Sequence, residues 1–256
     1  MTLVSLTTDF GLKDYYVAEL KSAILNHVKG VQIIDISHNI DKFDIVQAAF
    51  YLKNVLHTFP SDSIHVVGVY THYKRESEII CFAKDGNIFI GPNNGVFSLV
   101  FEDMTSIKIY KVNAPNGNAI SSNALLTHAI AYISHGLPLT EIGPELTSFH
   151  QKMLLKPVLG QHQIRASIIH IDNFENVIIN LKKSEFEFYR NGRNFELYYK
   201  QHEPITQIFK HYGDVPIGDP VAFFNSADYL VLAVNLDKAA SLYNLHKNEM
   251  IQIYFH

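Results

Sequence analysis

An aspartate that follows the first apolar segment is the residue of this chain best placed to do chemistry. Asp9 comes directly after the apolar residues 2–6 and two threonines, and a helical pattern of apolar residues begins at Val17. This order predicts that Asp9 lies at the carboxyl end of a parallel strand, where open α/β sheets bind ligands. A carboxylate there can accept hydrogen bonds from two vicinal hydroxyls, such as those of a ribose. The alternative is a purely structural turn.

Two further turns place polar or aromatic residues at the ends of predicted strands. Asp35 and His38 close the second strand, and Phe43 follows just before a helix. An aromatic ring at that place can stack on a flat ligand, or it can staple the helix. Residues 92–95, Pro-Asn-Asn-Gly, follow the strand at 88–90 and place Asn94 in a tight turn. Each of these signals is weak alone.

Length and composition favour two modest domains. The chain has 256 residues, of which 47% are hydrophobic, enough to bury a sizeable core. Strand and helix patterns alternate through residues 1–150, which predicts an α/β domain with a mostly parallel sheet and helices on both faces. Residues 157–256 read as a series of short strands, including one at 186–189 and a hairpin turn at Asn191-Gly192, which predicts a small β-barrel or sandwich.

Charge and residue usage argue against several classes of partner. The net charge of −4, with both signs interspersed, leaves no basic stripe for nucleic acid. No apolar run approaches the roughly 20 residues of a membrane span, and charged residues interrupt the N-terminus. The single cysteine, Cys81, lies in an apolar run and indicates a reducing, cytoplasmic compartment. Although the chain has 14 histidines, none shows the spacing of a zinc site, so no metal or other cofactor is expected.

Taken together, the motifs resemble one family. Residues 7–11 (TTDFG), 34–38 (IDISH), 92–95 (PNNG), 136–139 (GLPL) and 171–177 (IDNFENV) recur in this order in the S-adenosylmethionine hydroxide adenosyltransferases, which include the fluorinase and the chlorinase. The resemblance implies a homotrimer that binds a nucleoside between the first domain of one subunit and the second domain of its neighbour. It also implies displacement at the 5′ carbon of S-adenosylmethionine by water or halide, with S-adenosylmethionine as the substrate rather than a cofactor. Because the sulfonium is already an activated leaving group, the protein mainly has to align and desolvate the nucleophile.

The resemblance also assigns roles to individual residues. It implies that Asp9 holds the ribose hydroxyls and that Phe43 flanks the sugar. Asp172 and Ser226 are expected to bind the amino and carboxylate ends of the methionine part, Phe174 and Asn176 to line the adenine side, and Asn235 and Leu236 to offer backbone contacts to the purine edge. Asn94 is a further expected substrate-binding residue.

The sequence departs from the hydrolytic members at the loop after the third strand. Tyr70 stands where those members have an aspartate, Ser77 or Glu78 where they have an arginine, and Ser121 where they have a histidine. Tyrosine at this place is also found in the halogenases, and Ser122 aligns near a serine that contacts fluoride. However, the halogenases carry a small threonine at the place of Tyr73 and an arginine at the place of Ala227.

Three candidates for the altered chemistry follow from these departures. Tyr70, His72 and Ser122 are the expected catalytic residues, and Arg75 could fix an anionic partner. Three functions stay open: a hydrolase that releases adenosine and methionine, a halogenase, and a binding protein that keeps the nucleoside pocket without the chemistry.

Overall fold

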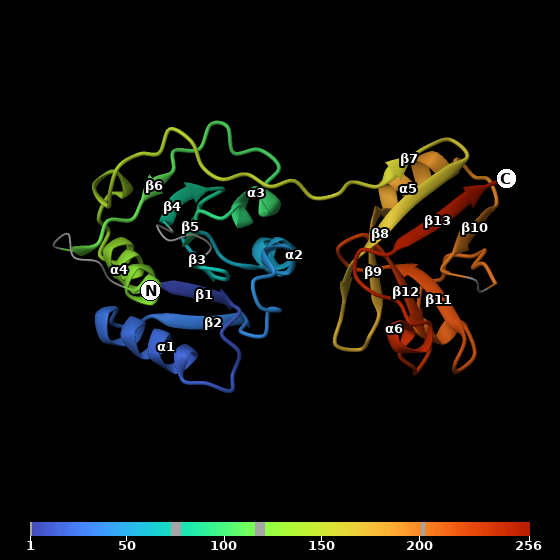
Figure 1. Ribbon diagram of the computed structural model, residues 1–256, viewed down its shortest axis with the longest axis horizontal. Coiled ribbons are helices and arrows are strands. Elements are labelled where there is room, and N and C mark those ends of the chain that lie inside the picture. The colour runs from blue at the N-terminus through green and yellow to red at the C-terminus, as the bar shows by residue number, and fades with distance from the viewer. Residues whose placement is uncertain (1, 73–77, 116–120, 201–202) are drawn as a thin grey trace. The chain divides into compact units, whose positions relative to one another are not determined.

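The protein folds into two compact units. The computed structural model describes residues 2–72, 78–115, 121–200 and 203–256. The chain divides into a first unit, Met1–Leu154, and a second unit, Leu155–His256. Figure 1 shows helices and strands mixed in the first unit and mainly strands in the second. Each unit has its own hydrophobic core, and each is described by itself.

A six-stranded sheet forms the middle of the first unit, in the order β2-β1-β3-β5-β4-β6. Strands β2, β1, β3 and β5 are parallel, whereas β4 runs antiparallel to β5 and β6, so the predicted mostly parallel sheet is confirmed. Strand β1 is buried on both of its faces, as expected for such a sheet. The strands are β1 (Leu3–Thr8), β2 (Gln32–Ser37), β3 (Ile64–Gly68), β4 (Ile79–Lys84), β5 (Asn87–Pro92) and β6 (Tyr110–Lys111).

Helices cover both faces of this sheet, as the sequence predicts. α1 (Tyr16–His27) and α4 (Ser122–Ser134) share a core with Val4 and Leu6 of β1. α2 (Ile45–Val55) and α3 (Val96–Val100) pack on the opposite face. Helix α2 begins at Asp44, whose side chain accepts hydrogen bonds from two backbone amides of the first turn. The short 3-10 helices are η1 (Leu56–Thr58) and η3 (Leu139–Glu141).

The second unit contains a curled antiparallel sheet with the path β10-β13-β8-β9-β12-β11, and β7 pairs with β8. Figure 1 shows that the sheet curls into a half-barrel. Closure into a full barrel or packing into a sandwich stays a prediction. The strands are β7 (Val158–Leu159), β8 (Gln163–Ile171), β9 (Val177–Lys182), β10 (Phe195–Tyr198), β11 (Pro220–Phe224), β12 (Tyr229–Val234) and β13 (Met250–Phe255); the helices are α5 (Lys183–Arg190), η4 (Tyr212–Asp214) and α6 (Ala239–Leu242).

The expected strand at 186–189 is wrong, because these residues belong to helix α5. In a strand Phe186 and Phe188 would share one face, but Phe186 is fully buried and Phe188 is 77% exposed. The backbone amide of Lys182 donates to the Glu185 carboxylate, which stabilises the start of the helix. The expected hairpin turn at Asn191-Gly192 is therefore the end of this helix, where Asn191 adopts the left-handed conformation with φ 46°.

Candidate functional site

The first candidate residue, Asp9, lies where the topology of the sheet leaves a crevice. Strand β1 lies between β2 and β3. α1 connects β1 to β2 on one face of the sheet, and α2 connects β2 to β3 on the other. The connections therefore leave β1 and enter β3 on opposite faces, which makes the β1/β3 boundary the topological switch point. Asp9 follows the last residue of β1, so the predicted position at the carboxyl end of a parallel strand is confirmed.

One oxygen of the Asp9 carboxylate organises two loops. Its Oδ2 accepts hydrogen bonds from the backbone amides of Phe43 and Tyr70, both at 3.1 Å. Both donors adopt left-handed backbone conformations, with φ values of 68° and 51°. Such values are uncommon for bulky residues and occur at functional sites. Among the residues that the structure describes, none donates a hydrogen bond to the other oxygen, Oδ1, so this atom is available to a ligand.

The side chains of Phe43 and Tyr70 form an aromatic wall beside Asp9. Their ring centroids lie 5.3 Å apart and the planes meet at 60°, an edge-to-face arrangement. Phe43 is 63% exposed and Tyr70 37% exposed, so both rings offer surface to a ligand. A carboxylate oxygen next to exposed aromatic rings suits a sugar joined to a flat base.

Asn94 binds the backbone of the turn that carries Tyr70. Its Nδ2 donates to the carbonyl oxygens of Val69 at 3.0 Å and Tyr70 at 3.2 Å, while its Oδ1 accepts from the amide of Val96. The side chain is 5% exposed. Because these bonds use both amide hydrogens, the described structure gives Asn94 the role of holding the Tyr70 turn. Its direct contact with a substrate stays a prediction.

Two of the three expected catalytic residues come close together beside Tyr70. The Oγ of Ser122 lies 3.5 Å from Nε2 of His72, at the long end of the hydrogen-bond range. Ser122 is the first residue of α4 and is buried, whereas His72 is exposed. Ser121 accepts a hydrogen bond from the amide of Ala124 and caps the helix, which explains a serine at this position. Tyr73, Arg75 and Ser77, which belong to the loop that departs from the hydrolytic members, lie outside the described residues.

In the second unit, Asp172 closes the loop between β8 and β9. Its Oδ1 accepts from the amides of Phe174 at 2.8 Å and Asn176 at 2.9 Å, and its Oδ2 accepts from Asn176 Nδ2. The same Nδ2 also donates to the Tyr212 hydroxyl at 3.3 Å. Burial and the negative charge of Asp172 raise the pKa of Tyr212, which keeps this hydroxyl protonated at neutral pH. Phe174 is 74% exposed at the tip of the loop.

Asn235 and Leu236 lie at the same end of the sheet as this loop. Leu232 pairs with Val177, so the end of β12 lies beside the start of β9. The Nδ2 of Asn235 donates to the carbonyl of Val215 at 2.8 Å, and Leu236 is 81% exposed with φ 58°. The structure therefore brings Asp172, Asn176, Asn235 and Leu236 to one end of the unit.

Ser226 lies at the opposite end. It is an exposed residue of the turn between β11 and β12, and this turn is next to the end of β9, because Tyr229 pairs with Lys182. With about 3.3 Å per residue, the six residues of β9 separate the two ends by roughly 17 Å. Within one chain, Ser226 and Asp172 thus approach a common ligand only if that ligand is long.

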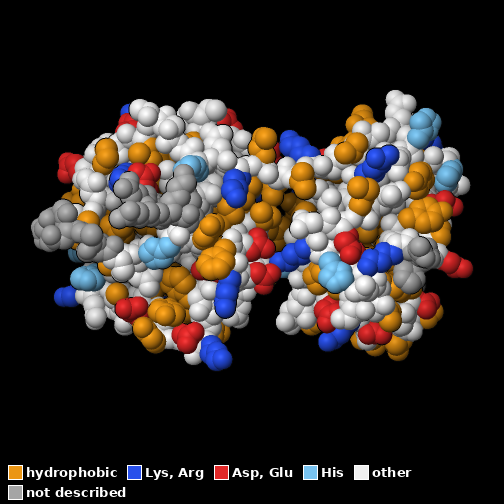
Figure 2. Space-filling view, viewed as in Figure 1, with side chains coloured by type: hydrophobic (Ala, Val, Ile, Leu, Met, Phe, Trp, Pro, Cys, Tyr) orange, Lys and Arg blue, Asp and Glu red, His pale blue; other side chains and the backbone are white. Residues whose placement is uncertain are grey.

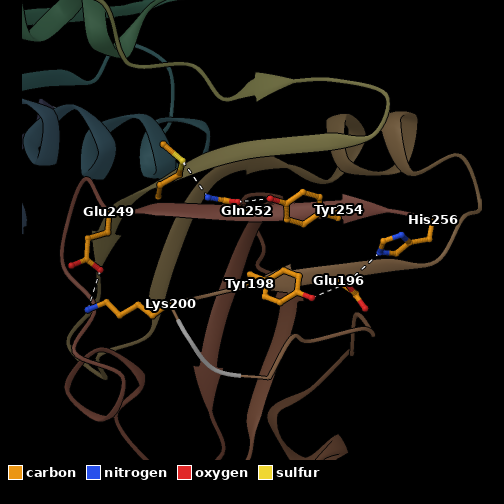
Figure 3. A pocket seen from close by; sticks show the side chains of 8 residues that line it. Glu196, Tyr198, Lys200, Glu249, Gln252, Tyr254 and His256 are labelled. Atoms are coloured by element: carbon orange, nitrogen blue, oxygen red, sulfur yellow. Dashed lines mark hydrogen bonds and ion pairs between the residues drawn. The ribbon is translucent and has the colours of Figure 1, made fainter.

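A separate concave surface lies on the outer face of β10 and β13. It encloses about 760 Å³ and contains none of the expected site residues. Figure 3 shows that its polar groups pair with one another: Tyr198 and His256 with Glu196, Tyr254 with Gln252, and Lys200 with Glu249. These pairs satisfy the side chains without a ligand, so this surface does not compete with the Asp9 crevice as a candidate site.

The surface and the composition of the described residues bear on the other expected partners. On the face seen in Figure 2, Lys and Arg side chains alternate with Asp and Glu, and the side chains drawn there form no continuous basic stripe. Within the described ranges, no three His, Cys, Asp or Glu side chains are grouped so that they could hold a metal ion. No helix found there is long and apolar enough to span a membrane.

Comparison with known proteins identifies the family. Residues 4–143 match the SAM hydroxide adenosyltransferase N-terminal domain, and residues 166–252 match the C-terminal domain of the same family. The chain belongs to the SAM hydroxide adenosyltransferase family. The resemblance seen in the motifs is thus confirmed.

Relatives within the SAM hydroxide adenosyltransferase family carry two kinds of name. An (R)-S-adenosyl-L-methionine hydrolase of Methanocaldococcus jannaschii is 28% identical, over 100% of this chain and 97% of the relative. A hydrolase of the same name from Thermus thermophilus is 24% identical, over 99% and 100%. A fluorinase of Actinoplanes is 24% identical, over 95% and 94%.

Solved structures share the fold of this SAM hydroxide adenosyltransferase family member. A crystal structure of an uncharacterized conserved protein from Thermotoga maritima superposes with a TM-score of 0.87, at 24% identity, over 99% of this chain and 100% of that one. A conserved hypothetical protein from Thermus thermophilus gives a TM-score of 0.77 at 23% identity, over the full length of both chains. At this level of identity the likeness concerns the fold alone.

Proposed function

We propose that this protein cleaves S-adenosylmethionine by attack of water on the 5′ carbon, releasing adenosine and methionine. Membership of the SAM hydroxide adenosyltransferase family and the full-length hydrolase relatives support the reaction class. The observation that carries the proposal for this chain is the Asp9 carboxylate at the switch point, with Oδ2 fixed by two amides and Oδ1 available. This geometry suits a ribose with two neighbouring hydroxyls.

The proposed reaction needs alignment more than activation. The water oxygen forms the new bond to the 5′ carbon, the carbon–sulfur bond breaks with its electron pair going to sulfur, and the water loses one proton. Asp9 holds the ribose hydroxyls and Phe43 and Tyr70 flank the sugar, so that the 5′ carbon is fixed relative to the incoming water. His72, 3.5 Å from Ser122, is the residue that we propose accepts the proton, and Ser122 orients the water.

We propose that the site is completed by a neighbouring subunit in a homotrimer. Each unit exposes apolar side chains next to its candidate residues: Phe43 and Leu12 in the first unit, and Phe174, Ile217 and Leu236 in the second, all more than 60% exposed. Exposed groups of this kind are typical of interfaces. In this proposal Asp172, Asn176 and Ser226 hold the methionine and adenine ends, Asn235 and Leu236 contact the purine edge, and the curled sheet closes as a small barrel. The lone buried cysteine fits a cytoplasmic enzyme.

Product analysis tests the proposal. Purified protein is incubated with S-adenosylmethionine, and nucleosides and amino acids are separated by liquid chromatography and mass spectrometry. We expect adenosine and methionine in equal amounts, and we expect the Asp9→Ala variant to form neither. The matched control is Tyr254→Phe, on the outer face of β13, which holds no candidate residue and should retain full activity. Wild-type protein at high concentration that forms no adenosine would contradict the proposal.

Two further arms separate the other functions. Chloride, bromide or fluoride in the incubation gives a 5′-halo-adenosine only if the protein is a halogenase, which is the function that Tyr70 in place of an aspartate favours. Ligand-dependent stabilisation without any product identifies a binding protein, because a ligand that binds the native state raises the melting temperature by mass action.

A further inference from the structure

A chain of polar contacts, buried at Thr8 and His38 and more exposed at Asp35 and Lys21, runs behind the Asp9 crevice. Thr8, the last residue of β1, has its Oγ1 2.8 Å from Nδ1 of His38. The Nε2 of His38 lies 3.0 Å from Oδ1 of Asp35, and Oδ2 of Asp35 lies 2.5 Å from Nζ of Lys21 in α1. Thr8 is fully buried and His38 is 4% exposed, so neither side chain can meet a ligand directly.

The direction of these bonds follows from what each group can donate. The Nε2 of His38 faces the Asp35 carboxylate at ion-pair distance, although the contact does not have the geometry of a hydrogen bond. Because a carboxylate has no hydrogen to give, Nε2 is the nitrogen that carries the hydrogen. In the neutral imidazole Nδ1 then accepts, and the Thr8 hydroxyl donates to it. Lys21 and His38 together lower the pKa of Asp35 although its partial burial acts to raise it, so this carboxyl is ionised at neutral pH and keeps its accepting role.

The same segment is bound to the turn that carries Asp9. The amide of Gly11 donates to the carbonyl of His38 at 2.7 Å, and the amide of Ile40 donates to the carbonyl of Thr8 at 3.3 Å. The Thr8 hydroxyl also lies 3.4 Å from the amide of Phe10. Asp9 is therefore flanked on both sides by residues that this network holds. A site that must orient a ligand needs its polar groups fixed to about 0.5 Å.

We propose that Thr8, His38 and Asp35 form a positioning relay for Asp9. The relay fixes the end of β1 so that Asp9 keeps Oδ2 on the amides of Phe43 and Tyr70 and presents Oδ1 to the ribose. The binding role rests on the proposed function, whereas the control of the two amides does not. A buried polar network is more costly than an apolar contact at the same place. A satisfied polar pair also fixes the orientation of its groups, and this is the property that the Asp9 carboxylate needs.

A second hydroxyl–imidazole pair in the same sheet provides a control. The Oγ of Ser5 lies 2.7 Å from Nδ1 of His65, and both side chains are fully buried. This pair lies in the middle of β1 and β3, and no described group accepts from the Nε2 of His65. It has the same chemistry as the Thr8–His38 pair but lacks the carboxylate and the contact with the Asp9 turn, so it should affect stability alone.

Three variants test the relay. Thr8→Val keeps the shape of the side chain but removes the hydroxyl, Thr8→Ser keeps the hydroxyl, and Ser5→Ala breaks the control pair. Adenosine affinity is measured by calorimetry, and hydrogen exchange of the Phe43 and Tyr70 amides by NMR. We expect Thr8→Val to weaken adenosine binding about tenfold, the equivalent of one lost hydrogen bond, and to speed the exchange of both amides. We expect Thr8→Ser to bind within about twofold of wild type, and Ser5→Ala to change neither readout.

The outcomes separate the relay from a structural role and from the proposed function. Thr8→Val with wild-type affinity and unchanged amide exchange overturns the relay, as does an equal loss of affinity in Ser5→Ala. If the wild-type protein binds no adenosine, the nucleoside function fails, and the exchange of the two amides still decides whether the relay positions Asp9. If Thr8→Val does not fold, Asp35→Leu replaces it, because a leucine side chain cannot accept a hydrogen from Nε2. There we expect the nitrogen chemical shifts of His38 to report a change of tautomer together with faster exchange of both amides, and unchanged shifts and exchange overturn the relay.

Discussion

Phe43 and Tyr70 come from loops 27 positions apart in the chain, yet their backbone amides donate to the same oxygen of Asp9 and their rings pack edge to face. Both residues adopt a left-handed backbone in this arrangement, which is costly for bulky side chains. One carboxylate at a strand end therefore holds a strained aromatic pair in place. The strain, and the buried groups around it, can each be measured.

The strain at Phe43 can be measured by replacing it with alanine and with glycine. Both variants remove the ring, but only alanine keeps a Cβ in the left-handed region. We expect Phe43→Gly to be more stable than Phe43→Ala by about 1 kcal/mol in urea unfolding, and both to lose nucleoside affinity. Equal stability of the two variants would show that the backbone relaxes and that Asp9 holds no strain there.

The two hydrogen bonds that Asn94 donates can be separated from the one that it accepts from the first residue of α3. In Asn94→Asp the carboxylate can still accept from the amide of Val96 but cannot donate to the carbonyls of Val69 and Tyr70. We therefore expect a loss of about 1–3 kcal/mol in the free energy of unfolding, similar to that of Asn94→Ala. A variant as stable as the wild type would mean that the two carbonyl contacts contribute nothing.

The buried histidine of β3 should make stability depend on pH. Burial lowers the pKa of His65 to about 4, below the value near 6.5 of an unfolded chain. Between these two pH values the unfolded state binds more protons than the native state. The contribution of the neutral His65 to stability is therefore complete above pH 6.5 and is lost as the pH falls towards 4. The loss is about 1.4 kcal/mol per pH unit and about 3 kcal/mol in total.

Urea unfolding of His65→Gln between pH 4.5 and pH 7, the window set by these pKa values, checks this prediction. We expect the variant to be less stable at neutral pH but to show a flatter dependence on pH than the wild type. His57→Gln, which replaces an exposed histidine, should retain the wild-type slope. Parallel pH profiles of wild type and His65→Gln would mean that this imidazole titrates in the same way in both states.

The single cysteine should be inert in the native protein. Cys81 is fully buried in β4, and burial raises the pKa of its thiol to about 12. Since the thiolate is the reactive form, we expect no labelling by a disulfide reagent at pH 8 until the protein is unfolded in guanidinium. Labelling of one thiol per chain within seconds in the native protein would contradict both its burial and its protonation.

The sequence predicts the place of Asp9 because the signals are local. The apolar strand, the turn and the following helix are adjacent in the chain. Ligands bind at the carboxyl ends of parallel strands, so this order is enough to predict where Asp9 lies. The relay behind Asp9 could not be predicted in this way. Thr8 and His38 are 30 positions apart, and only the pairing of β1 with β2 brings them together.

Two other outcomes show where pattern reasoning fails. The alternation of Phe186 and Phe188 imitates a strand, but the carboxylate of Glu185 on the amide of Lys182 starts a helix there. The shared role of Asp172 and Ser226 stays a prediction, but residue spacing does not show that the register of β9 with β12 places them at opposite ends of the sheet. Register is set by strand pairing across the whole unit, which residue spacing alone does not show.

In the proposed reaction, water attacks the 5′ carbon of a nucleoside whose ribose is held by Asp9. The most direct measurement is the reaction of S-adenosylmethionine in water enriched in oxygen-18, followed by mass spectrometry of the product. We predict adenosine that carries one heavy oxygen on its 5′ carbon, formed together with methionine by the wild type and not by Asp9→Ala. No labelled adenosine from the wild type, or an equal yield from Asp9→Ala, would contradict the account.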